Sequence, residues 1–242
     1  MRIFIFSILS IIFNIAISSA QEKIIFKSLD SLEITSEWYK INENGPVILL
    51  CHQARSSRGE YSKIAPLLNA VGFNCLAVDL RSGDKMQGIS NETAQRARIK
   101  KLSMDYLSAE KDILASIEFL SKKVGKPIIL MGSSYSASLA LKIAVSNEKV
   151  LAVIAFSPGE HFEKKIDVKN SIKDLNKLAF ISSTQGESKI IRNLIGEMIH
   201  FDKINHYVPQ KEGKHGALAL SKTNPNHEEY WVALKMFLEK LK

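Results

Sequence analysis

The chain has 242 residues, long enough for one large α/β domain or two small ones, and no Pro/Gly/Ser-rich linker, low-complexity tract or internal repeat divides it. Its net charge of +8 comes with lysines dispersed among acids, as in Glu110-Lys111-Asp112, and with neither zinc-finger spacing nor an aromatic RNA-binding box. We therefore expect a single domain with solvated charged faces and no nucleic-acid partner.

The first twenty residues have the pattern of a secretory signal peptide. A positive start is followed by an apolar run over residues 3–17 and by small residues at 18–20. An uncleaved membrane anchor is the alternative, but the run is shorter than the ~20 residues that span a bilayer, and an asparagine interrupts it. The sequence thus predicts a signal peptide over residues 1–20 and a soluble, exported domain over residues 21–242, either periplasmic or extracellular.

Apolar runs of strand length then alternate with helix-like segments along the rest of the chain. Strands are expected at residues 24–26, 32–39, 47–51, 75–78, 127–131, 150–156, 179–181 and 204–208. Helices are expected at residues 61–71, 104–122, 137–146, 187–199 and 228–241, with a long polar excursion over residues 81–101. The alternation predicts an α/β fold with a mostly parallel sheet covered by helices on both faces. In such sheets, functional residues gather at the carboxyl ends of the strands.

Two cysteines in an exported chain raise the question of a disulfide. Cys51 ends one predicted strand and Cys75 lies near the start of the next. If these strands are parallel neighbours, an offset of four residues separates the thiols by ~13 Å, whereas a disulfide needs Cα atoms within ~7 Å. We therefore expect two buried thiols.

The pentapeptide Gly132-Ser133-Ser134-Tyr135-Ser136 lies between a predicted strand and a predicted helix. A serine on such a sharp turn exposes its hydroxyl above the sheet, and small residues two positions before and after it let strand and helix close up. The usual pattern is G-x-S-x-G, and Ser136 takes the place of the last glycine. The pattern predicts Ser134 as a nucleophile.

A serine nucleophile needs a base and an acid that orients the base, in the chain order serine, acid, histidine. His215 follows the last predicted strand in the glycine-bracketed loop Glu212 to Gly216, where it can reach the strand ends. Glu187, in the loop after residues 179–181, is the predicted acid, and Glu160, in the loop after the preceding strand, is the alternative.

The oxyanion of an acyl-transfer intermediate needs two hydrogen-bond donors. One is expected to be the backbone amide of Tyr135, the residue after the nucleophile. The other is expected in the loop after residues 47–51, which begins with His52.

Together these residues resemble the α/β-hydrolase superfamily, in particular its compact, lid-poor, dienelactone-hydrolase-like members. The resemblance covers nearly all of residues 24–241, through His52, the segments 79–83 and 132–136, and Lys214-His215-Gly216. It implies a single-domain α/β-hydrolase fold without a large lid. It also implies mainly structural roles for His52, Asp79 and Arg81.

Two positions depart from the pattern of that family. Gln53 stands where a glycine usually follows the histidine of the oxyanion loop. By position Ala54 is the best match for the second oxyanion donor, and Gln53 is the next. The name-giving dienelactone hydrolases have a cysteine where this chain has Ser134, so their substrate is not carried over.

The sequence therefore predicts a serine hydrolase that cleaves small carboxylic esters with Ser134, Glu187 and His215, without a metal or an organic cofactor. Its partner is a small-molecule ester, and its oligomeric state stays open. A peptidase or acyltransferase could use the same three residues. A binding protein with a lapsed hydrolase site is a further alternative, motivated by the altered Gln53 and Ser136.

Overall fold

The computed structural model describes residues 20–242, so the predicted signal peptide lies outside the described residues except for its last position. An eight-stranded sheet has the order β1-β2-β4-β3-β7-β8-β9-β10. β1 and β2 run antiparallel to their neighbours, and the remaining pairs are parallel, as predicted. The strands are β1 (Ala20–Lys27), β2 (Glu33–Lys40), β3 (Val47–Cys51), β4 (Asn74–Val78), β7 (Ile128–Ser133), β8 (Val150–Phe156), β9 (Leu178–Ser182) and β10 (Ile204–Tyr207).

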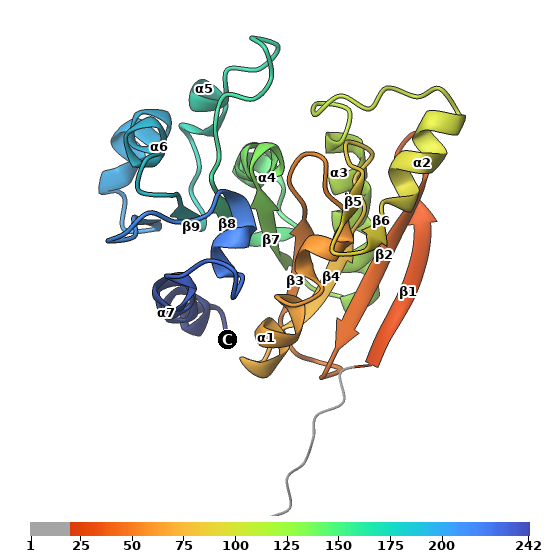
Figure 1. The fold of residues 1–242 in the computed structure, drawn as a ribbon, viewed down its shortest axis with the longest axis horizontal. Coiled ribbons are helices and arrows are strands. Elements are labelled where there is room, and N and C mark those ends of the chain that lie inside the picture. Colours follow the sequence, from red (N-terminus) through yellow and green to blue (C-terminus); the bar gives the residue numbers. More distant parts are fainter. Residues whose placement is uncertain (1–19) are drawn as a thin grey trace, which may run out of the picture.

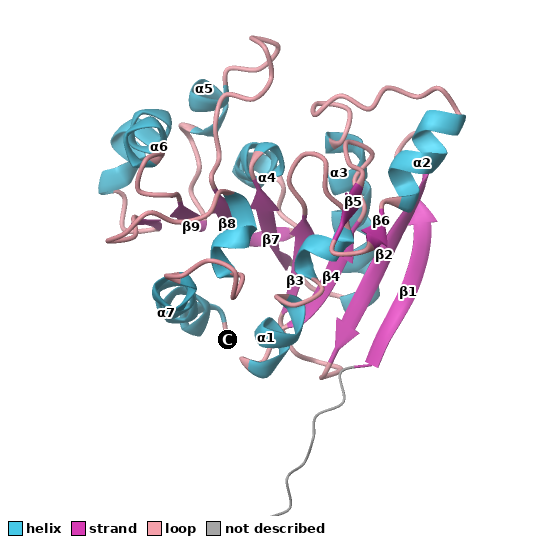
Figure 2. Ribbon diagram, in the orientation of Figure 1, coloured by secondary structure: helices cyan, strands magenta, loops and turns pink. Residues whose placement is uncertain are grey.

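Helices cover both faces of this sheet. They are α1 (Ala65–Ala70), α2 (Glu92–Ile99), α3 (Glu110–Val124), α4 (Tyr135–Ser146), α5 (Val168–Ile172), α6 (Ser188–Ile195) and α7 (His227–Leu238), with 3₁₀ turns η1 (Arg58–Tyr61), η2 (Gly196–His200), η3 (Gly216–Leu220) and η4 (Glu239–Leu241). Figure 1 shows α1 and α7 on one side of the sheet and α3, α4 and α6 on the other. The fold is thus a three-layer α/β arrangement, and Figure 2 shows loops joining its strands and helices.

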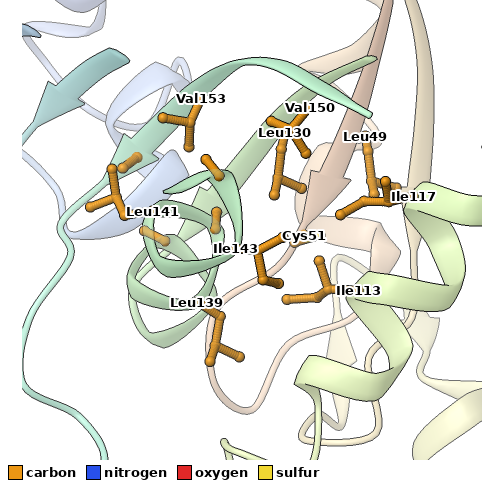
Figure 3. Packing of buried hydrophobic residues seen from close by; sticks show 14 of the residues in the cluster. Leu49, Cys51, Ile113, Ile117, Leu130, Leu139, Leu141, Ile143, Val150 and Val153 are labelled. Carbon is orange, nitrogen blue, oxygen red and sulfur yellow. The ribbon is translucent and has the colours of Figure 1, made fainter. Parts of the chain in front are cut away.

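The two sides of the sheet bury separate hydrophobic cores. Figure 3 shows part of one of them, the cluster to which Leu49 of β3, Leu130 of β7, Ile113 of α3 and Leu139 of α4 belong. These four side chains are fully buried. Burial of a leucine or isoleucine side chain contributes about 1.5–3 kcal/mol, so the continuous apolar runs of the central strands account for the layered packing.

The strand register brings the functional loops together. Ser133 of β7 is the register partner of Phe156 in β8, which in turn pairs with Ser182 in β9. Cys51, the last residue of β3, pairs with Gly132. Because all four strands are parallel, the loops that follow them leave from the same edge of the sheet.

Cys51 and Cys75 are both buried free thiols, as expected. Cys75 pairs with Ile48, so the offset along the parallel strands is three residues instead of four, about 10 Å. The thiols also belong to the cores on opposite faces of the sheet.

Several helix boundaries differ from the predicted ones. The helix expected over residues 61–71 is shorter, because η1 precedes it and Pro66 lies in the first turn of α1. Proline fits the first turn of a helix and disrupts its interior. The helix expected over residues 104–122 begins at Glu110, because Asp105 Oδ1 accepts the Ser108 amide in a turn before it.

The polar excursion over residues 81–101 contains structure that the sequence pattern did not indicate. A short ribbon of β5 (Lys85–Met86) and β6 (Ile89–Ser90) is followed by α2. Asn91 caps this helix, because its side-chain oxygen accepts the Ala94 amide at 2.7 Å. Across residues 20–242, no helix combines the length and the apolar character that crossing a membrane requires.

We expect Asp112→Ala to lower the free energy of unfolding by about 3 kcal/mol, because it removes the fully buried one of the two carboxylates that pair with Arg81 and leaves the guanidinium with the partly exposed Asp30. Asp112 accepts hydrogen bonds from Arg81 Nη2 (2.7 Å) and Nε, and both side chains are almost completely buried. Urea denaturation measures the loss. Glu110→Ala on the same helix removes only the partly exposed pair with Lys142 and should cost about 1 kcal/mol or less. Equal losses in the two variants would contradict this prediction.

Candidate active site

Ser134 lies on the sharp turn that joins β7 to α4. Its backbone has φ 60° and ψ −124°, a strained conformation for a residue with a side chain. A Cβ added to Gly132 would lie 2.4 Å from the Ser136 carbonyl oxygen and 2.6 Å from Ala137 Cα. Only glycine therefore fits two residues before Ser134. This is the local geometry that the pentapeptide predicts.

Ser136, which replaces the second glycine of the pattern, is fully buried and hydrogen-bonded. Its Oγ accepts the Ser133 amide at 2.9 Å and is 2.8 Å from the Cys51 carbonyl, to which it donates. The substitution thus links the turn around Ser134 to the end of β3, where the predicted oxyanion loop begins.

His215 and Glu187 come together, although 28 positions separate them in the sequence. Nδ1 of His215 lies 2.5 Å from Glu187 Oε1. Because an ionised carboxylate only accepts hydrogen bonds, Nδ1 carries the proton and Nε2 is left as the basic nitrogen. A carboxylate in this position holds the imidazole tautomer and stabilises its protonated form.

The pKa values of the pair are shifted in the directions that an imidazole–carboxylate contact produces. Burial alone raises the pKa of Glu187, but hydrogen bonds from His215, the Thr184 amide and the Ser157 hydroxyl together lower it to about 2. The hydrogen bond to Glu187 raises the pKa of His215, against the opposite effect of burial. Glu187 is therefore ionised at neutral pH.

Ser157 supports this pair, although no sequence motif marks it. Its hydroxyl donates to Glu187 Oε2 at 2.7 Å and accepts the Gly216 amide at 3.0 Å. The residue has φ 53° at the end of β8, which turns the chain sharply there. One serine thus connects the loops of Glu187 and His215. The only available signal was its position directly after a predicted strand.

The loop that carries His215 is fastened to the residue before Ser134. The Ala217 amide donates to Ser133 Oγ at 2.8 Å, and a Cβ on Gly216 (φ +68°) would lie 2.4 Å from the same oxygen. No hydrogen bond between Ser134 and His215 is described within residues 20–242. Such contacts in active sites are often long until substrate binds. The catalytic roles of these residues stay a prediction.

Glu160, the alternative acid, has a different set of partners. Its carboxylate accepts the amides of Val168 and Lys169 at 2.9 Å each, at the start of α5. The structure gives it no hydrogen bond to His215 in the described part of the chain. Glu187 is thus the carboxylate that meets the histidine.

The predicted oxyanion donors differ in what their amides already bind. Tyr135 is the first residue of α4, and the first amides of a helix have no partner within it. The Gln53 amide donates to Glu60 Oε2 at 2.9 Å, so it is committed elsewhere. For the Ala54 amide, no hydrogen bond is described among residues 20–242. Of the two candidates in this loop, only Ala54 has an available donor.

His52, at the start of the same loop, is structural, as the resemblance implies. It is fully buried, its Nδ1 donates to the Gln53 carbonyl (2.7 Å), and its Nε2 accepts the Leu80 amide (2.9 Å). Burial lowers its pKa to about 4, so it is neutral and ties the loop to the end of β4.

A pocket of about 280 Å³ lies between residues 105–107 and residues 161–165, and neither Ser134, Glu187 nor His215 lines it. Tyr106, Leu107 and Phe162 supply its apolar wall, and the polar residues lining it are Asp105, His161, Glu163 and Lys165. The Tyr106 ring stacks on that of Tyr135 at a centroid distance of 4.5 Å. Burial and the charge of His215 lower the pKa of His161.

No protein-family model matches the chain, and no curated protein matches its sequence. Solved structures do share its architecture, among them an esterase, a dienelactone hydrolase and another α/β-hydrolase. The chain has the α/β-hydrolase fold, which confirms what the sequence resemblance predicted.

Three solved structures illustrate the likeness. An esterase from Pyrococcus furiosus is 17% identical with a TM-score of 0.71, and the match covers 93% of each chain. A dienelactone hydrolase from Anabaena variabilis is 14% identical with a TM-score of 0.66, over 90% of this chain and 95% of the other. The α/β-hydrolase GrgF from a Penicillium species is 12% identical with a TM-score of 0.68, over 91% and 98%. At these identities, the likeness is one of fold.

Proposed function

We propose that this chain is an exported serine hydrolase that cleaves small carboxylic esters through an acyl-enzyme on Ser134. The observation that carries the proposal is the 2.5 Å contact between His215 Nδ1 and Glu187 Oε1, on a loop fastened to Ser133. An oriented imidazole beside a serine on a strained strand-to-helix turn is the arrangement that activates a hydroxyl nucleophile.

In the proposed reaction, Ser134 Oγ forms a bond to the acyl carbon while its proton passes to His215 Nε2. The amides of Tyr135 and Ala54 donate to the developing oxyanion. The bond from the acyl carbon to the alcohol oxygen then breaks, and His215 returns the proton to that oxygen. Water attacks the acyl-enzyme with His215 as base, and Ser134 Oγ regains a proton as the acid leaves. Glu187 stays ionised throughout.

The short connection between β8 and β9 supports a small or exposed substrate. Between β8 and β9 the chain has only the five-residue α5 as an additional helix, so no large lid covers the site. We therefore expect esters with short acyl groups as substrates, in preference to long-chain lipids.

A panel of p-nitrophenyl esters and aminoacyl p-nitroanilides tests the proposal. We expect turnover of the short-chain esters, weaker turnover of acyl chains longer than about ten carbons, and none of the anilides. A peptidase using the same residues would instead cleave the anilides, and anilide turnover without ester turnover would refute the esterase proposal.

A non-catalytic binding protein is the alternative from another class. It is disfavoured because Ser136, one of the two departures that motivated it, has a hydrogen-bonded place in the fold. The described hydrogen bonds of Gln53 come from its backbone, and its side-chain Oε1 is buried without a partner among the described residues. A fluorophosphonate probe separates the two possibilities, since it labels only an activated serine. Absence of labelling in well-folded wild-type protein would favour the binding protein.

Export is proposed from the sequence of residues 1–20 alone. The mass of the intact protein recovered from the periplasm or the medium should correspond to a chain that starts at Gln21. Recovery of the full-length chain in the membrane fraction would contradict the proposal.

A further inference from the structure

Glu60 is a buried carboxylate that the proposed reaction does not use. It lies in η1 and is fully buried. Its Oε2 accepts the Gln53 amide at 2.9 Å, which fixes the oxyanion loop one residue before Ala54. Its other oxygen, Oε1, is buried without a hydrogen-bond partner among the described residues.

The surroundings of Glu60 join three catalytic loops. The hydroxyls of Ser133 and Ser56 lie close enough to favour its charged form. Ser133 Oγ also accepts the Ala217 amide. A Cβ on Gly216 would lie 2.4 Å from Ser133 Oγ and 2.6 Å from Gln53 Oε1. Glu60 is therefore at the junction of the oxyanion loop, the strand end before Ser134 and the loop of His215.

Such a carboxylate reduces the stability of the fold. Burial raises the pKa of Glu60, although the Gln53 amide, the two hydroxyls and the charge of His215 act against this effect. Since the folded-state pKa lies above the unfolded value, the charged form of Glu60 is less favourable in the folded protein than in the unfolded chain. Stability is then greatest below the unfolded pKa and falls as pH rises through the folded pKa. A neutral amide of the same shape avoids this loss.

We infer that Glu60 is a positioning residue for the proposed reaction: it holds the oxyanion loop through the Gln53 amide and stabilises the imidazolium that His215 becomes. The inference rests on the proposed function. A neutral amide at this position would make the folded state more stable, so the carboxylate is retained for catalysis. Glu60 itself does not contact the substrate.

The electrostatic part of this role follows from the groups around His215. Glu187 and Glu60 each raise the pKa of His215, while its charge lowers the pKa of His161. The titratable neighbours of Glu60 are His215 and the buried phenols of Tyr61 and Tyr135. Burial raises the pKa values of both phenols well above the ordinary value for tyrosine, so both are neutral at physiological pH. The charge of Glu60 therefore acts mainly on His215.

Glu60→Gln separates charge from position, because its amide oxygen still accepts the Gln53 N–H. We expect the titration midpoint of His215, followed by NMR of the imidazole, to shift to lower pH in this variant. The acidic limb of the kcat/KM profile should shift in the same direction. An unchanged or higher midpoint would overturn the inference. Because the NMR measurement needs no activity, an inactive wild-type protein would contradict the esterase proposal and still leave Glu60 tested.

Glu60→Ala removes the acceptor as well as the charge. We expect kcat to fall about 10- to 100-fold with KM within about twofold, because a misplaced oxyanion loop weakens transition-state binding more than substrate binding. A KM effect with unchanged kcat would contradict the positioning role. Glu110→Gln, which changes a carboxylate paired with Lys142 on α3, is the control and should leave the His215 midpoint unchanged.

The free energy of unfolding distinguishes a positioning residue from a residue that only stabilises the fold. We expect Glu60→Gln to be at least as stable as wild type, with an advantage in urea denaturation that grows as pH rises. A loss of stability at every pH, together with an unchanged His215 midpoint, would assign Glu60 to the fold alone.

Discussion

Ser134→Ala is expected to lower kcat for ester hydrolysis by about 10⁴–10⁶-fold and to abolish fluorophosphonate labelling. The variant removes the atom that forms the acyl-enzyme, so neither His215 nor the oxyanion donors can compensate. The fold should be unaffected, since the structure describes no hydrogen bond of the Ser134 hydroxyl within residues 20–242. Labelling and p-nitrophenyl ester turnover are measured on the same preparation, with circular dichroism to verify folding.

Ser146→Ala is the matched control for this change. Ser146 is exposed at the far end of α4, the helix that Ser134 precedes. The Ser146→Ala variant should therefore retain both fluorophosphonate labelling and ester turnover. Continued labelling of Ser134→Ala would assign the nucleophile to another residue. Loss of activity in both variants would instead indicate that the helix itself is disturbed.

Glu187→Gln is expected to lower kcat by about 10³–10⁴-fold while leaving the fold intact. The amide can donate to Nδ1 of His215, which favours the tautomer with the proton on the wrong nitrogen. The same change removes the main cause of the raised pKa of His215. Because the free enzyme needs a neutral imidazole, wild-type activity falls as pH falls through that pKa. The acidic limb of the residual activity in the variant should therefore lie at lower pH.

Glu160→Gln provides the comparison for the acid. Glu160 accepts two amides at the start of α5 and has no described contact with His215, so turnover should stay within about twofold of wild type. If Glu160→Gln caused the large loss and Glu187→Gln did not, the assignment of the acid would be wrong.

The central part of the fold could be predicted from the sequence because its signals are local. The apolar runs at 47–51 and 150–156 are strands with the predicted ends. Such runs have one stable environment, a strand covered on both faces. The excursion over residues 81–101 is different: the mean hydropathy of α2 is low, and its stability comes from the Asn91 cap and from contacts with Asp79 and Arg58 distant in sequence. Those partners cannot be inferred from periodicity.

The residues of the candidate site also fall into two groups, those that a local sequence pattern predicts and those that it does not. Ser134 has a local signature, and His215 and Glu187 follow strands in the chain order typical of the fold. Ser157 and Glu60 have no such signature, because their roles depend on hydrogen bonds to residues from other loops. The same limit applies to Gln53: only the structure reveals that its amide is already occupied, which leaves Ala54 as the donor in that loop.

The common row of strand ends makes the site sensitive to changes far from it. Ser133, Phe156 and Ser182 are aligned across three parallel strands, so the spacing of the backbones determines how far apart their loops begin. Sliding β9 by one residue would reverse the facing of every side chain along it and draw the Glu187 loop away from its neighbours. Substitutions in the middle of β9 that favour such a slip could therefore inactivate the protein, while insertions on the opposite edge of the sheet would leave the distances between the reacting groups intact.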